Sequence, residues 1–151
     1  MNSGQLPKTV LLLGDPIAGE GTAAASITPG MLVSVDGDGV APASAGAAIA
    51  RFARENEVIG KGIDSDYSTG DRVLYYHARS GDHFYAWLAQ GEDIATGALL
   101  SAGANGTLVA ADEGDGAASP VEFPSLVLCM AMEDVDNAPG EGPVRIKVEV
   151  V

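Results

Sequence analysis

One pattern in this sequence occurs twice and limits the folds that the chain can adopt. The segment Ile27–Ser44 (ITPGMLVSVDGDGVAPAS) returns 67 residues later as Ile94–Ala111 (IATGALLSAGANGTLVAA). Each copy has an entry turn, a short apolar stretch, an Asx-Gly pair and a second short stretch. Asp, Asn and Gly tolerate the positive φ of tight turns, so Asp38-Gly39 and Asn105-Gly106 predict β-hairpins. The repeat favours a compact β structure with rough internal symmetry.

The glycine and proline content agrees with this interpretation. The 151 residues include 20 glycines and 8 prolines spread along the chain, which fits many short strands better than long helices. We predict a mainly β protein, a compact β-barrel or sandwich-like domain built from short hairpins, with at most one short helix. Residues 27–151 are expected to form this single domain. Residues 1–26 are expected to form an extended N-terminal arm with one short strand at Thr9–Leu13.

Several further segments have a recognisable pattern. Ser44–Glu57 is open between a helix, which its alanines favour, and a short strand around Phe52. We predict a strand at Val58–Ile63, a surface loop at Asp112–Ser119 and the most continuously buried strand at Ser125–Met132. Val144–Val150 alternates without a fault, so its valines and Ile146 should face the core and its charged residues should face outward.

The aromatic residues gather in one predicted hairpin. Its strands are Arg72–Arg79 and His83–Ala89, and a Ser-Gly-Asp turn joins them. Tyr85 and Trp87 should share one face, with Phe84 and Leu88 on the other. The rings either pack in the core or, as the alternative function, let Tyr75, Tyr85 and Trp87 stack on sugars in a carbohydrate-binding β module.

The net charge of −13 bears on possible partners. Twenty-one carboxylates against eight Lys and Arg repel phosphate backbones and anionic membrane surfaces, so we expect neither nucleic acid nor membrane as a partner. The longest continuous apolar run, Leu126–Met132, is far below the ~20 residues that span a bilayer. The start of the chain does not have the pattern of a secretory signal, which predicts a protein made and kept in a cytoplasm or delivered from there inside a larger assembly.

Residues that could carry chemistry are few and scattered. His77 and His83 could approach each other across the predicted hairpin, and a small hydrolase using either one is a third alternative. Cys129 lies in an apolar run typical of packing. Gly14–Thr22 has the glycine spacing of a phosphate loop, but Glu20 stands where that loop needs lysine. We therefore expect no catalytic residue, no metal site, no cofactor and no enzymatic activity.

The order of several segments resembles the capsid decoration (cement) proteins of tailed bacteriophages. The segments are Leu6–Thr9, Ile27–Val33, Glu55–Glu57, Tyr67–Val73, Ser80–Asp82, Ile94–Ser101 with Asn105-Gly106, Ala131–Asn137 and Arg145–Val151. The resemblance implies a small β-rich protein on the outer surface of an icosahedral virion head, made in the host cytoplasm. It implies a homotrimer that binds the major capsid protein, bridges capsomers and stabilises the shell against the pressure of packaged DNA.

On this hypothesis, the N-terminal segment and the aromatic strands supply the contacts with the capsid or between subunits. The predicted interface residues are Thr9, Val10, Leu11, Leu12, Leu13, Ile17, Tyr75, Tyr85 and Trp87. Small residues dominate from Gly19 to Ser26, so that part of the arm is expected to bury little and to reach a neighbouring subunit or capsomer.

Overall fold

A computed structural model describes residues 6–111 and 126–151, and it confirms the β-rich fold. The described residues form thirteen strands and two 3-10 turns. The strands are β1 (Leu11–Leu13), β2 (Ile17–Thr22), β3 (Val33–Asp36), β4 (Gly39–Pro42), β5 (Arg51–Ala53), β6 (Arg72–His77), β7 (His83–Leu88), β8 (Asp93–Ile94), β9 (Leu99–Ala102), β10 (Leu108–Ala110), β11 (Cys129–Ala131), β12 (Val135–Asp136) and β13 (Val144–Val150). The 3-10 turns are η1 (Glu57–Ile59) and η2 (Ala104–Gly106).

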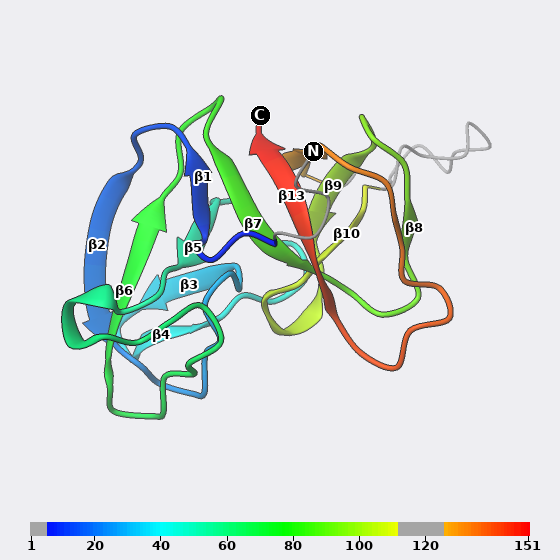
Figure 1. Ribbon diagram of the computed structural model, residues 1–151. Helices are drawn as coiled ribbons and strands as arrows, with labels where there is room; N and C mark the ends of the chain where they lie inside the picture. The colour runs from blue at the N-terminus through cyan, green and yellow to red at the C-terminus, as the bar shows by residue number, and fades with distance from the viewer. Residues whose placement is uncertain (1–5, 112–125) are drawn as a thin grey trace.

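Five strands close into a barrel, on the right of Figure 1. They pair in the order β7-β10-β9-β11-β13, and β13 returns to β7 along six positions, from Val144↔Leu88 to Glu149↔His83. β1 pairs with the other edge of β7 through Leu11↔Phe84. The barrel therefore joins the N-terminal, central and C-terminal parts of the chain.

Alternating apolar side chains fill the barrel, as the period-two pattern of the last strand predicts. Ile146 and Val148 are fully buried, and so are Phe84 and Leu88. The ring of Phe52, from β5, stacks on Phe84 with 4.7 Å between centroids, so it links the barrel to the rest of the molecule. The predicted inward side of β13 is confirmed.

Five of the remaining strands form a smaller lobe, on the left of Figure 1, whereas β8 pairs with β12 in a separate two-stranded sheet and lies on the right. The smaller lobe contains the three-stranded sheet β2-β6-β5 and the β3–β4 hairpin. Its own core is a second cluster of buried residues: Ala23, Ile27, Val33, Val40, Ala53, Tyr67 and Val73.

Both copies of the repeated segment form hairpins, but their turns differ. In β3–β4 the loop is Gly37-Asp38, and the positive φ falls one residue later, at Gly39 (+121°). In β9–β10 both Asn105 (+53°) and Gly106 (+73°) have positive φ. The Asx-Gly signal thus identified both reversals, whereas the positive-φ geometry that it predicts for both residues occurs only in the second copy.

The predicted aromatic hairpin is wrong, because β6 and β7 pair with different sheets. β6 lies between β2 and β5, whereas β7 pairs with β1, β10 and β13. Asp82 is buried in the connection and fixes the crossing: its carboxylate accepts the backbone N–H of Asp15 at 3.1 Å and of Arg79 at 2.8 Å. Pairing with segments distant in the sequence therefore outweighs the tendency of a short connection to form a hairpin.

Two further predictions need correction, and one open alternative is resolved. Val58–Ile63 is not a strand; it begins in η1 and turns at Gly60, which has a φ of +75°. Within Ser44–Glu57 the strand alternative holds at Arg51–Ala53, and no helix forms. The buried strand predicted at Ser125–Met132 is limited to Cys129–Ala131, since Leu126 is 55% exposed. The predicted loop Asp112–Ser119 lies outside the described residues.

The segment predicted as an N-terminal arm is extended and pairs within its own chain. Val10 is fully buried and Leu11–Leu13 pairs with β7. Ile17–Thr22 pairs with β6 at six positions. Ala23, expected to bury little, is 2% exposed. The small residues suit this close packing, because Gly19 lies directly against the ring of Tyr75.

Candidate interaction surfaces

The nine predicted interface residues do not form one surface. Val10 and Tyr85 are buried, and only Thr9, Leu13 and Ile17 are exposed. Ile17 and Tyr75 line one shallow hollow of the small lobe, whereas Tyr85 and Trp87 lie on the outside of the barrel beneath Arg145. The structure thus brings Ile17 and Tyr75 together and separates Tyr75 from the other two aromatic residues.

Arg145 covers the Tyr85–Trp87 face and corrects the expectation that it points into solvent. Its guanidinium lies 4.3 Å from the Trp87 ring centroid and 5.5 Å from that of Tyr85. Its side chain is only 10% exposed, and Nη2 donates to the carbonyl of Ile63 at 2.8 Å. The long side chain packs on the rings through cation–π contact.

Hydrogen bonding also holds the indole in place. Trp87 Nε1 donates to the carbonyl of Pro29 at 3.0 Å. Burial raises the pKa of the Tyr85 hydroxyl and lowers the pKa of Arg145. A sugar ring cannot stack on the Trp87 face that the guanidinium occupies, so this geometry works against the carbohydrate-binding alternative.

Exposed apolar side chains gather around His77, and we call this the His77 surface. Ile17 is 52% exposed, Ile49 46%, Val127 36% and Val151 54%. His77 lines two adjoining hollows, one of about 200 Å³ beside Ile17 and one of about 470 Å³ beside the other three residues. Ile49 was not predicted as an interface residue, because its segment had no clear pattern.

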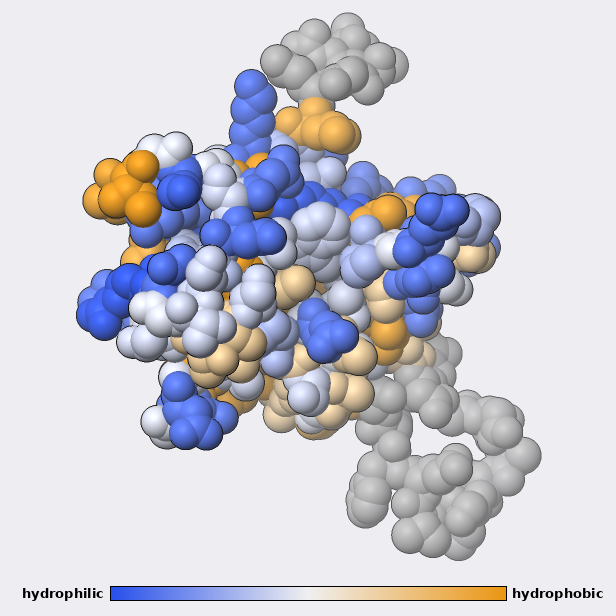
Figure 2. All heavy atoms as spheres, turned by 90° about the horizontal axis from the view of Figure 1, so that it is seen from below, coloured by the Kyte–Doolittle hydropathy of each residue, from blue (hydrophilic) through white to orange (hydrophobic). Residues whose placement is uncertain are grey.

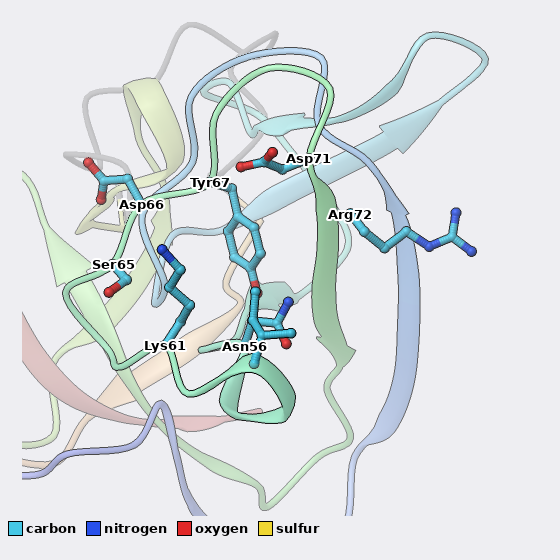
Figure 3. Close-up of a pocket in the computed structure, with 8 residues that line it drawn as sticks. Asn56, Lys61, Ser65, Asp66, Tyr67, Asp71 and Arg72 are labelled. Carbon is cyan, nitrogen blue, oxygen red and sulfur yellow. The ribbon is translucent and has the colours of Figure 1, made fainter.

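A third hollow, of about 420 Å³, lies between η1 and the start of β6 (Figure 3). The ring of Tyr67 forms its wall, and its hydroxyl donates to the carbonyl of Arg54 at 2.7 Å. Arg72 points away from the hollow in Figure 3 and pairs with Glu20 on β2 at 2.6 Å. Asp71 accepts the backbone N–H of Ser68. Arg72 thus links β6 to β2, and Asp71 stabilises the turn that precedes β6.

The turn η1 presents two strongly exposed apolar side chains, Val58 (81%) and Ile59 (65%). η1 is the coil at the left edge of Figure 1, and Figure 2 shows strongly hydrophobic atoms projecting at that same edge. The rest of the face in Figure 2 is mostly polar or weakly apolar. The strand predicted at Val58–Ile63 would place Val58 and Ile59 on opposite faces, so the sequence did not indicate that both are exposed together.

The residues considered for chemistry lie on three different strands, His77 on β6, His83 on β7 and Cys129 on β11. His77 pairs with Ile17 and Arg51, and His83 lies 3.6 Å from Glu149 on the barrel. Cys129 is buried, and burial raises the pKa of its thiol to about 12. In residues 6–111 and 126–151, no three His, Cys, Asp or Glu side chains are grouped to hold a metal ion, and no helix is long and apolar enough to cross a membrane.

Comparison with solved structures identifies a protein with a similar fold. No protein-family model and no curated protein matches this chain. The crystal structure of the head fiber gp8.5 N base of bacteriophage phi29 has a similar fold, with a TM-score of 0.54 and 17% sequence identity. The match covers 89% of this chain and 93% of that one. The two chains therefore share one β-rich fold over nearly their whole lengths.

Proposed function

We propose that this chain is a structural protein of a bacteriophage virion that binds the head. The observation that carries the proposal is the shared fold with the head fiber base, which extends over nearly the whole of both chains. The ordered motifs that resemble decoration proteins support the same assignment independently. The proposed role is binding rather than catalysis.

In its finer form, the proposal is a decoration protein on the outer surface of an icosahedral head. Its partners are the major capsid protein and, in a homotrimer, two further copies of itself. Many copies held by modest contacts around a symmetric shell would reach high total affinity through multivalency. The His77 surface is the proposed contact, because it combines apolar side chains with shallow hollows at one end of the fold.

Co-sedimentation tests the proposal. Heads are purified from the phage that encodes this chain after deletion of its gene, and the purified protein is added back. We expect saturable binding, and we expect decorated heads to release DNA at a higher temperature than bare heads. Absence of binding to the heads would refute the proposal. Binding without a change in heat resistance would refute the stabilising role alone.

Two substitutions of similar exposure locate the contact. Ile49→Asp adds a charge to the His77 surface, whereas Val35→Asp adds one to the β3–β4 hairpin. The two side chains are 46% and 37% exposed, so both variants should fold. We expect a loss of head binding of at least tenfold for Ile49→Asp only. Equal binding of the two variants would move the contact to another surface.

A further inference from the structure

The strand β2 has one edge that no described strand covers along most of its length. It is the outer strand of the sheet β2-β6-β5 and lies at the far left of Figure 1. Its inner edge pairs with β6 from Ile17 to Thr22. Beyond Thr22, Ala24 donates its N–H to Val40 of β4, so the outer edge is occupied only from that point on.

The hydrogen-bond alternation shows which backbone groups face outward. Ala23 donates to the carbonyl of Asp71 and accepts from the N–H of Gly70, so Ala23 points toward the β6 side. Every second residue of an antiparallel strand points the same way, so Ile17, Gly19 and Gly21 also face β6. Ala18 and Glu20 therefore direct both their N–H and C=O groups to the outer edge.

A ring from the neighbouring strand reaches this edge because Gly19 has no side chain. A Cβ on Gly19 would lie 2.6 Å from Cζ of Tyr75 and 2.9 Å from its hydroxyl oxygen. The outer half of the ring thus covers Gly19. Beside it lies the hollow of about 200 Å³ that Ile17, Arg51 and His77 also line.

The charged side chains beside the outer edge of β2 indicate which kind of partner it can bind. Glu20 is already paired with Arg72 at 2.6 Å, but Arg51 has no ion-pair partner among the described residues. Arg51 is the Lys or Arg side chain that lines this hollow, so it suits a carboxylate from another molecule. Edge-to-edge pairing of two β2 strands would need two-fold symmetry, which the proposed homotrimer does not have, so we expect a different protein as the occupant.

We infer that the outer edge of β2 binds an extended, carboxylate-bearing segment of the head shell protein as an additional strand. Ala18 and Glu20 form the backbone hydrogen bonds, and a side chain of the incoming segment lies in the hollow against Tyr75, with its carboxylate near Arg51. This inference rests on the proposed function and specifies how the chain contacts its partner.

Proline at position 18 tests the strand pairing. Ala18→Pro removes an N–H that faces outward and spares the bonds to β6, and proline is tolerated on an edge strand in that position. Ala18→Val keeps the N–H and is the matched control. With heads lacking the protein, we expect binding of Ala18→Pro to fall at least tenfold at unchanged secondary structure, while Ala18→Val binds like wild type.

Charge reversal provides a second test that does not alter the backbone. Arg51→Glu should weaken head binding at least fivefold, whereas Lys61→Glu changes the net charge equally at an exposed residue of the hollow beside Tyr67 and should not. If wild type binds heads and both Ala18→Pro and Arg51→Glu bind equally well, the inference is wrong but the proposed function stands. If wild type does not bind, the proposed function fails first. Self-association in sedimentation velocity that only Ala18→Pro abolishes would assign the edge to a second copy and overturn the inference.

Discussion

The carbonyl of Gly106 accepts the backbone N–H of Leu32 at 2.8 Å, and this bond joins the two copies of the repeated segment. Gly106 also donates its own N–H to Ala43 at 2.8 Å, at the end of the first copy. The turn of the β9–β10 hairpin therefore bonds to both residues that flank the β3–β4 hairpin, Leu32 before it and Ala43 after it. Leu32, Ala43 and Gly106 are all buried, so the contact connects the barrel to the small lobe.

Gly106→Ala should destabilise the protein strongly. The residue has a φ of +73°, and a Cβ would lie 2.7 Å from the Leu32 carbonyl oxygen. The left-handed backbone costs about 1 kcal/mol with a side chain, and the overlap adds about 1–3 kcal/mol. We expect urea unfolding to show a loss of about 2–4 kcal/mol.

Gly91→Ala is the matched control for this variant. Gly91 has a φ of +90°, but a Cβ there would meet no atom within 4 Å. Its substitution should cost only the backbone strain of about 1 kcal/mol. Equal losses in the two variants would show that the contact with Leu32 does not contribute.

Arg145→Met should loosen the packing on Trp87. The variant keeps an apolar stem but loses the bond to the Ile63 carbonyl and the cation–π contact. These interactions are worth about 1–3 kcal/mol together after the cost of burying the guanidinium. We expect lower stability in urea and a red shift of the Trp87 fluorescence, since water gains access to the ring.

Lys147→Met is the control on the same strand, because Lys147 also faces outward, opposite Tyr85, whereas the cation–π contacts with Tyr85 and Trp87 come from Arg145. Its stability should change by less than about 0.5 kcal/mol. A red shift of similar size in Lys147→Met would show that Arg145 does not specifically shield the Trp87 ring from water.

Truncation should separate folding from binding at the N-terminal segment. Removing residues 1–20 deletes β1, most of β2 and the fully buried Val10, whose N–H bonds to the buried Glu55 at 3.0 Å. Loss of Val10 burial alone costs about 1.5–3 kcal/mol. We expect a lower melting temperature by circular dichroism.

Removal of residues 1–8 keeps Val10 and both strands, so it should melt like the full chain. If the longer truncation also melts like the full chain, residues 9–20 do not belong to the cooperative fold. Loss of head binding by the longer truncation is informative only alongside this measurement, since unfolding alone would abolish binding.

Cys129 makes stability depend on pH in the alkaline range. Burial raises the pKa of its thiol from 9.0 to about 12, so the folded state retains the proton that the unfolded state loses near pH 9. Stability is unaffected below pH 9 and falls by about 1.4 kcal/mol for each unit between pH 9 and 12. Cys129→Ala should flatten this dependence between pH 9 and 10.

A labelling experiment checks the same burial directly. At pH 8 a thiol-specific disulfide reagent should react slowly with the native protein and rapidly in denaturant, because only a thiolate reacts and only unfolding exposes it. Rapid labelling of the native protein would show that the thiol is accessible.

Local signals predicted much of the fold. Asx-Gly pairs marked both hairpins of the repeat, and the alternation in Val144–Val150 identified the longest strand of the barrel. These signals are reliable because turn chemistry and side-chain period depend on residues within a few positions of one another. The same local information placed Tyr85 and Trp87 on one face of β7 but could not show that Arg145 covers them.

By itself, the sequence determined the two hairpins of the repeat and the apolar side of β13. Only the tertiary structure decided how the other strands pair. A three-residue Ser-Gly-Asp turn predicted that β6 and β7 form a hairpin, yet Asp82 is buried in a crossing between two sheets and each strand pairs with distant segments. The physical reason is that strand pairing depends on the total apolar surface that all segments bury together. A local sequence pattern describes only a few neighbouring residues and cannot predict that total.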